Sequence, residues 1–193
     1  MSRFTRPLPA GIRHLDELEE PLAALREDAS RIETWGRRLA AVLGSGGRLL
    51  AAGNGGSAAQ ATHLTSELVG RYRDDRPPFS AIALCSESSA MTAIGNDYGI
   101  EEVFARQVRA HGRAGDVLVA LSTSGGSANV LAAVAAANAC GMTTWGLCGR
   151  PGSALALTCD EVLCVDSPHT ATVQEIHLIA VHLLCASFEE ELA

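Results

Sequence analysis

Four hydroxyl side chains stand close together at a point where the sequence pattern changes. This segment follows an apolar run, precedes an alanine-rich helical stretch, and contains Ser122, Thr123, Ser124 and Ser127. Hydroxyls and free backbone N–H groups at a helix N-terminus favour a phosphate group. An ordinary helix cap would also use serine or threonine, but it needs only one such side chain. The segment therefore predicts a phosphate site that has no lysine or arginine of its own.

A second segment of small residues, Gly53-Asn54-Gly55-Gly56-Ser57, also lies between an apolar run and a helical stretch. With Ala58 it matches the relaxed dinucleotide fingerprint GxGxxA. That fingerprint requires an acidic residue about twenty positions later at the end of the next strand. The nearest candidate, Glu87, comes about thirty positions later. We therefore expect a second anion-binding loop here rather than a dinucleotide site.

Side chains that could move protons or bind a metal occur on two helical stretches. His63 and Glu67, at positions i and i+4, share one face of a helix. In a chain with 22 acidic residues this spacing is common, and on spacing alone a surface carboxylate explains Glu67 more simply. The last helical stretch carries Gln174, His177 and His182. Periodicity does not choose between the two histidines, since either could face the site.

The 193-residue chain contains no lysine, and its fifteen basic residues, all arginine, face 22 acidic residues for a net charge of −7. The missing lysine excludes Schiff-base chemistry, attachment of pyridoxal phosphate and a Walker phosphate-binding loop. The acidic balance argues against nucleic-acid binding, which needs a basic surface.

Other missing features indicate the compartment. The first ten residues lack the apolar segment of a signal peptide, and no apolar run is long enough to span a membrane. The six cysteines form no CxxC pair and read as buried, reduced thiols. We expect a cytoplasmic protein that contacts neither membrane nor nucleic acid.

These residues must be positioned by the elements around them. Apolar residues at helical spacing predict two helices, over 12–25 and 32–42, before the first strand. Short apolar runs, each followed by a helical stretch, then predict buried parallel strands at Leu49–Ala52, Ala81–Leu84, Val117–Leu121, Thr143–Leu147 and Val162–Val165. The pattern indicates one α/β domain over 1–193, a doubly wound parallel five-stranded sheet (47–193) with an N-terminal helical extension (about 1–46). In such sheets ligands bind at the carboxyl ends of the strands, where both small-residue loops lie.

A series of motifs in this order resembles the phosphoheptose isomerase family of sugar isomerase (SIS) domain proteins, over residues 12–191. The motifs that carry the resemblance are Gly53–Ser57, His63-x-x-x-Glu67-Leu68-x-Gly70-Arg71, Ala93–Gly99, Val103–Val108, Gly115–Leu118, Ser122–Gly125 with Ser127–Val130, and Gln174–His177 with His182. The resemblance implies a flavodoxin-like SIS fold and conversion of sedoheptulose 7-phosphate to D-glycero-D-manno-heptose 7-phosphate. This aldose–ketose isomerisation moves a proton between C1 and C2 through an enediolate, so it needs a base and stabilisation of the enediolate oxygens.

The resemblance also implies the roles of particular residues. Glu67 would be the general base and His182 an acid–base group, while one Zn²⁺ per subunit, with variable occupancy, would be bound by His63, Glu67, Gln174 and His182. His177 would then be structural or lie behind the ligands. Contacts to the substrate would come from Asn54, Gly55, Gly56, Glu67, Asn96, Asp97, Ser122, Thr123, Ser124, Ser127 and Gln174. The family's homotetramers, with sites between subunits, imply that the N-terminal helices form an assembly surface.

Two segments depart from the family pattern. Ala171-Thr172-Val173 replaces an acidic or Gly-Arg segment shortly before Gln174, and Cys148–Ser153 replaces a Thr-Gly and Gly-Gly loop. Turn chemistry alone would also explain the polar pair Asn96-Asp97. The main alternative function is a non-enzymatic SIS-domain adaptor that binds the replication initiator protein, but such an adaptor has little need for the retained histidine and carboxylate set. A sugar-phosphate sensor would need a further regulatory domain.

Overall fold

The computed structural model describes residues 9–192. Two helices, α1 (Ala10–Glu27) and α2 (Ala29–Gly44), precede the first strand, and each includes the range predicted for it. The rest of the chain alternates between strands and helices in the order β1 (Leu49–Gly53), α3 (Gly56–Val69), β2 (Ala81–Ala83), α4 (Ser88–Tyr98), α5 (Glu102–His111), β3 (Val117–Ser122), α6 (Ala128–Ala139), β4 (Thr143–Cys148), α7 (Ala154–Thr158), β5 (Glu161–Cys164) and α8 (Thr170–Glu190).

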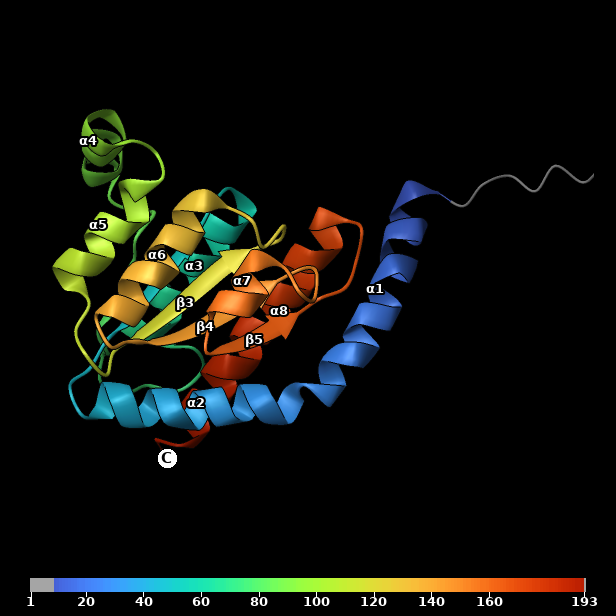
Figure 1. The fold of residues 1–193 in the computed structure, drawn as a ribbon. Coiled ribbons are helices and arrows are strands. Elements are labelled where there is room, and N and C mark those ends of the chain that lie inside the picture. The colour runs from blue at the N-terminus through green and yellow to red at the C-terminus, as the bar shows by residue number, and fades with distance from the viewer. Residues whose placement is uncertain (1–8, 193) are drawn as a thin grey trace, which may run out of the picture.

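The five strands form one parallel sheet, as predicted, and the structure shows that their order is β2-β1-β3-β4-β5. Strands β3, β4 and β5 are labelled in Figure 1. The chain leaves β1 toward one edge of the sheet and leaves β3 toward the other. In a doubly wound sheet this reversal opens a crevice at the carboxyl ends of the two central strands. The loops after β1 and β3, which contain the two small-residue segments, meet at this crevice.

Alternate residues of each strand face opposite layers, because successive side chains of a strand point to opposite faces. On one face, Leu49, Ala51, Val117 and Val119 pack in a core with α2, α3 and α8. On the other face, Leu50, Ala52, Leu118 and Ala120 pack with α5 and α6. Both faces are covered, which explains the continuous apolar character of the runs.

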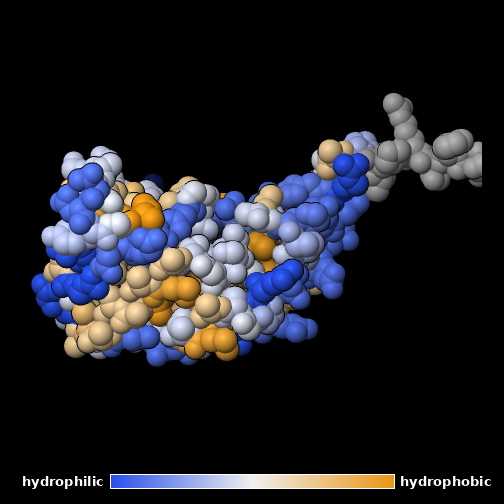
Figure 2. All heavy atoms as spheres, turned by 45° about the horizontal axis from the view of Figure 1, so that its top comes forward, coloured by the Kyte–Doolittle hydropathy of each residue, from blue (hydrophilic) through white to orange (hydrophobic). Residues whose placement is uncertain are grey.

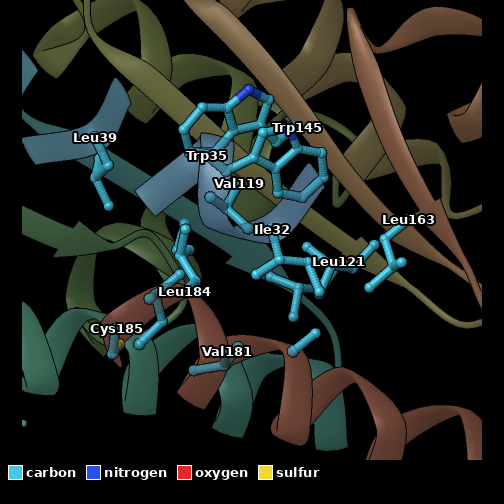
Figure 3. Close-up of a cluster of buried hydrophobic side chains, with 14 of the residues drawn as sticks. Ile32, Trp35, Leu39, Val119, Leu121, Trp145, Leu163, Val181, Leu184 and Cys185 are labelled. Atoms are coloured by element: carbon cyan, nitrogen blue, oxygen red, sulfur yellow. The ribbon is translucent and has the colours of Figure 1, made fainter. Parts of the chain in front are cut away.

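Two tryptophans join α2 to the sheet. The rings of Trp35 and Trp145 stack with centroids 5.0 Å apart and planes 2° apart, and both residues are buried (Figure 3). The indole Nε1 of Trp35 donates a hydrogen bond of 2.9 Å to Glu161. The α2 layer is therefore an integral part of the core.

Helix α1 projects from the body of the molecule as an arm (Figure 1). Its visible surface is mainly hydrophilic, with isolated apolar residues (Figure 2). Exposed apolar side chains on it are Ile12, Leu15 and Leu22. The arm contacts α8 through His14, whose Nε2 lies 2.9 Å from a carboxylate oxygen of Glu175.

Helix α8 alone, among the described residues, is long and apolar enough to cross a membrane, yet much of it is buried against α2, α3 and the sheet. A core helix passes the same test of length and hydropathy, and the burial of α8 is typical of one. All six cysteines are free thiols, of which Cys148 and Cys185 are buried and the others are partly buried. Burial raises the pKa of Cys185 to about 12, which keeps this thiol protonated.

Candidate active site

The segment from Ser122 to Ser127, here called the hydroxyl loop, connects β3 to α6. The hydroxyl of Ser122 lies 3.0 Å from that of Ser127 and 3.4 Å from that of Ser124. Ser127 occupies the N-cap position of α6, but its side chain makes no capping hydrogen bond. The hydroxyls thus face one another instead of closing the helix end, and they can turn their hydrogen bonds toward an anion.

The glycine loop, Gly53–Ser57, follows β1 and lies beside the hydroxyl loop. The side-chain amides of Asn54 and Asn129 exchange two hydrogen bonds of 2.9 Å and so join the glycine loop to the start of α6. A Cβ atom on Gly53 would lie 2.7 Å from the backbone of Ser57, so the tight turn excludes a side chain at this position. The two loops form one continuous edge of the crevice.

Gln174, in the first turns of α8, closes the other side of the glycine loop. A Cβ atom on Gly56 would lie 2.5 Å from the side-chain amide of Gln174, so only glycine lets this amide pack there. The backbone carbonyl of Gln174 accepts a hydrogen bond from Gln60 on α3. The structure therefore places the side chain of Gln174 against the glycine loop.

His63, Glu67 and His182 form a group that we name the histidine cluster. His63 and Glu67 project from α3 and His182 projects from α8. The Nε2 atom of His63 lies 3.0 Å from Nε2 of His182 and 3.3 Å from Oε1 of Glu67. The side chain of Glu67 is 18% exposed and that of His63 is 39% exposed, so solutes can reach the cluster.

Two imidazole nitrogens and a carboxylate oxygen are donors that suit zinc. Nε2 of His182 and Oε1 of Glu67 both lie close to Nε2 of His63, and the chemistry of these three donors fits the implied metal. Within residues 9–192, however, no group of three or more His, Cys, Asp or Glu side chains is already arranged to hold a metal ion. No described contact links Gln174 directly to the histidine cluster.

His177 lies apart from the cluster and is fully buried. Its Nε2 atom donates to the backbone carbonyl of Cys148 over 3.2 Å, because a carbonyl can only accept. Burial lowers the pKa of His177 to about 4, so the ring is neutral at pH 7. This histidine supports the end of β4.

Asn96 and Asp97 occupy a different local structure from the one expected. The sequence suggested a polar pair in a turn, but both residues belong to the last turn of α4, and both are exposed. Asn96 donates a hydrogen bond of 2.9 Å to Asp97. The helix continues to Tyr98 and ends at Gly99, whose φ is +92°. The sequence pattern did not indicate this position of the helix end.

A polar cavity of about 280 Å³ opens beside the hydroxyl loop. It is lined by Thr123, Ser124, Arg150, Ser167, Pro168, Thr170 and Val173. Arg150 is not among the predicted site residues, because no residue of the hydroxyl loop is basic and Arg150 lies 27 positions after Thr123. The only available signal was the unusual composition of the Cys148–Ser153 loop.

A family profile described as "SIS domain" matches residues 13–149. The phosphoheptose isomerase of Streptomyces coelicolor is 65% identical over 184 residues, which cover 95% of this chain and 80% of the relative. The solved phosphoheptose isomerase of Neisseria gonorrhoeae superposes with a TM-score of 0.82 at 41% identity, covering 93% of this chain and 94% of that one. The enzyme of Francisella tularensis gives a TM-score of 0.84 at 34% identity, covering 95% and 100%. The sheet order, the two loops and these similarities together show that the chain belongs to the phosphoheptose isomerase family of SIS-domain proteins.

Proposed function

We propose that this chain is an isomerase that converts sedoheptulose 7-phosphate to D-glycero-D-manno-heptose 7-phosphate. One observation carries the proposal: the glycine loop contacts the start of α6 through Asn129 and α8 through Gln174, so a sugar phosphate held at the hydroxyl loop extends toward α8. The relatives at 65% and 41% identity bear the corresponding name. The comparisons give no support to an adaptor for the replication initiator.

The phosphate end of the substrate binds the hydroxyl loop. The phosphate oxygens accept hydrogen bonds from the free N–H groups at the start of α6 and from the hydroxyls of Ser122, Thr123, Ser124 and Ser127. The sugar chain then lies along Asn54, Gly55 and Gly56, and reaches Gln174. Asn96 and Asp97, exposed on α4, contact the sugar, as the family resemblance implies.

Proton transfer falls to the histidine cluster. Glu67 takes the proton from C1 of the ketose, the 1,2-enediolate forms, and the proton is returned at C2. His182 exchanges a proton with the substrate oxygens, so the charge of the intermediate does not build up on one atom. The 3.0 Å approach of His182 to His63 supports a shared role for the two rings.

We propose that His63, Glu67, Gln174 and His182 would hold zinc. When bound, zinc would polarise the substrate oxygens as a Lewis acid. The variant His63→Ala is expected to lower the zinc content measured by atomic absorption, whereas the exposed His111→Ala is expected to retain it. Equal zinc content in the two variants would contradict this ligand set.

We further propose a cytoplasmic homotetramer with active sites shared between subunits. The exposed apolar residues of α1 and the free thiols support this arrangement. Analytical ultracentrifugation of the full chain measures the oligomeric state, and a monomer at micromolar concentration would refute it.

The central test is direct turnover. The purified protein, supplied with zinc, is incubated with sedoheptulose 7-phosphate, and ¹³C NMR follows the appearance of the aldose C1. Sedoheptulose without its phosphate serves as the control. It should react far more slowly because it lacks the phosphate group that the hydroxyl loop binds. Absence of turnover with sedoheptulose 7-phosphate and with related ketose phosphates would refute the proposed function.

A further inference from the structure

We propose that Arg150 supplies the positive charge that the hydroxyl loop lacks, and that it binds the phosphate group of the substrate in the cavity that it lines together with Thr123 and Ser124. This inference rests on the proposed function, because it takes the hydroxyl loop as the phosphate anchor. It assigns a substrate-binding and specificity-determining role to a residue of the Cys148–Ser153 loop.

The composition of the cavity wall supports this role. The lining includes Thr123 and Ser124 of the hydroxyl loop, and also Arg150, Ser167 and Thr170. The cavity is therefore walled by four hydroxyl side chains and one cation, and no carboxylate of the described chain contributes to it. A space of about 280 Å³ with this lining suits a phosphate ester.

Arg150 is also free to bind an anion. Within the described residues its guanidinium makes no hydrogen bond, ion pair or ring contact, and the residue is exposed. By contrast, Arg38, Arg76 and Arg109 are each paired with a carboxylate. A planar guanidinium donates two parallel hydrogen bonds to phosphate oxygens, which a hydroxyl cannot do.

The backbone holds Arg150 beside the hydroxyl loop. The N–H of Gly149 donates to the carbonyl of Thr123 over 3.1 Å, and the N–H of Leu155 donates to the carbonyl of Gly125 over 2.8 Å. A Cβ atom on Gly149 would collide with the carbonyl of Thr123. His177 donates a hydrogen bond to the carbonyl of Cys148, just before Gly149. The two loops therefore form one unit, and the residue after Gly149 has its position set by Thr123.

Charge explains why this position matters. The substrate carries a phosphate dianion, whereas the chain has a net charge of −7 and no lysine. Hydroxyls and amides bind the anion but do not neutralise it. A single guanidinium at the cavity wall lowers the repulsion between the phosphate and the acidic protein, and because Arg150 is exposed its contribution is screened by salt.

The test compares Arg150→Gln with Arg26→Gln in the full-length protein. Arg26 is the matched control because it is exposed, has no partner within the described chain, and changes the net charge by the same amount. We expect Arg150→Gln to raise the KM for sedoheptulose 7-phosphate about three- to tenfold with kcat nearly unchanged, and to flatten the rise of KM with ionic strength. Arg150→Lys should recover part of the loss, since it keeps the charge but not the two-pronged geometry.

Binding of inorganic phosphate, measured by calorimetry, separates this inference from the proposed function. If the wild-type protein does not isomerise the sugar phosphate, the proposed function fails, yet weaker phosphate binding by Arg150→Gln alone still supports the role of Arg150. Equal phosphate affinity, KM and salt dependence in Arg150→Gln and Arg26→Gln would overturn the inference. Both variants should keep the wild-type melting temperature, because neither side chain is buried.

Discussion

At the hydroxyl loop, backbone hydrogen bonds fix the positions of small side chains. The histidine cluster, in contrast, consists of larger side chains that project from two helices, α3 and α8, and contact one another. The first region contains no ionisable side chain, and the second contains two histidines and a carboxylate. A change of shape should therefore damage the first region, and a change of a single functional group should damage the second. Under the proposed function, this difference separates binding of the phosphate from proton transfer within one site.

The largest effect is expected where one functional group is replaced without a change of shape. Glu67→Gln should lower kcat by about 10²–10⁴-fold, because the amide cannot accept the proton. Binding of the phosphate ester should survive, and calorimetry with the substrate measures it. The matched control is Glu33→Gln, an exposed carboxylate on α2, which should leave kcat unchanged. Loss of binding together with turnover would show that Glu67 is structural, and the distinction between the two regions would fail.

A change of shape at the hydroxyl loop should have the next largest effect. In Gly149→Ala the added methyl group collides with the carbonyl of Thr123, so the Cys148–Ser153 loop and the hydroxyl loop must separate. We expect kcat/KM to fall about 100-fold, mostly through KM. Gly44→Ala, at a position with open space around it, is the control and should behave like the wild type. A fall confined to kcat would contradict an anchoring role.

His177, on α8, supports the end of β4 next to the loop that contacts the hydroxyl loop. The unfolded chain takes up a proton on this residue as the pH falls through about 6.5, whereas the folded protein does so only near 4. The free energy of unfolding should therefore decrease by roughly 3 kcal/mol between these pH values as the solution is acidified. Urea unfolding at several pH values measures this loss, and His177→Gln should show less of it. The same acid dependence in both proteins would place the titrating group elsewhere.

The smallest effect is expected at the arm, which lies outside both regions. Glu175 raises the pKa of His14 through a hydrogen bond and its negative charge. The contact between α1 and α8 is therefore strongest below the ordinary pKa of histidine and is lost as the pH rises through the raised value. Amide hydrogen exchange in α1 should accelerate with pH beyond its intrinsic rate, and His14→Gln should remove this extra acceleration with kcat within twofold of the wild type. A change in kcat of tenfold would mean that the arm acts on the site.

The sequence predicted the sheet well because buried parallel strands are apolar on both faces. All five strands lie within one or two residues of the predicted runs, and the glycine loop and the hydroxyl loop lie at the predicted ends of β1 and β3. Local chemistry explains this success. The signals for strand, glycine turn and helix start all lie within a few consecutive residues.

Features that depend on distant contacts could not be predicted in this way. Periodicity left His177 and His182 equivalent, and only the packing of α8 shows that His177 meets the carbonyl of Cys148 while His182 meets His63. Arg150 reaches the hydroxyl loop because β3 and β4 are neighbours in the sheet. The pair Asn96-Asp97 was wrongly placed in a turn. Its polarity is typical of turn residues, but exposure on the peripheral helix α4 explains that polarity equally well.

The stacked rings of Trp35 and Trp145 have an optical consequence. They are the two tryptophans of the whole chain, so all of its tryptophan emission comes from one pair of indoles in van der Waals contact. One ring belongs to α2 and the other to β4. Their coupled signal therefore reports whether that helix is docked on the sheet, and it allows folding to be followed separately from turnover.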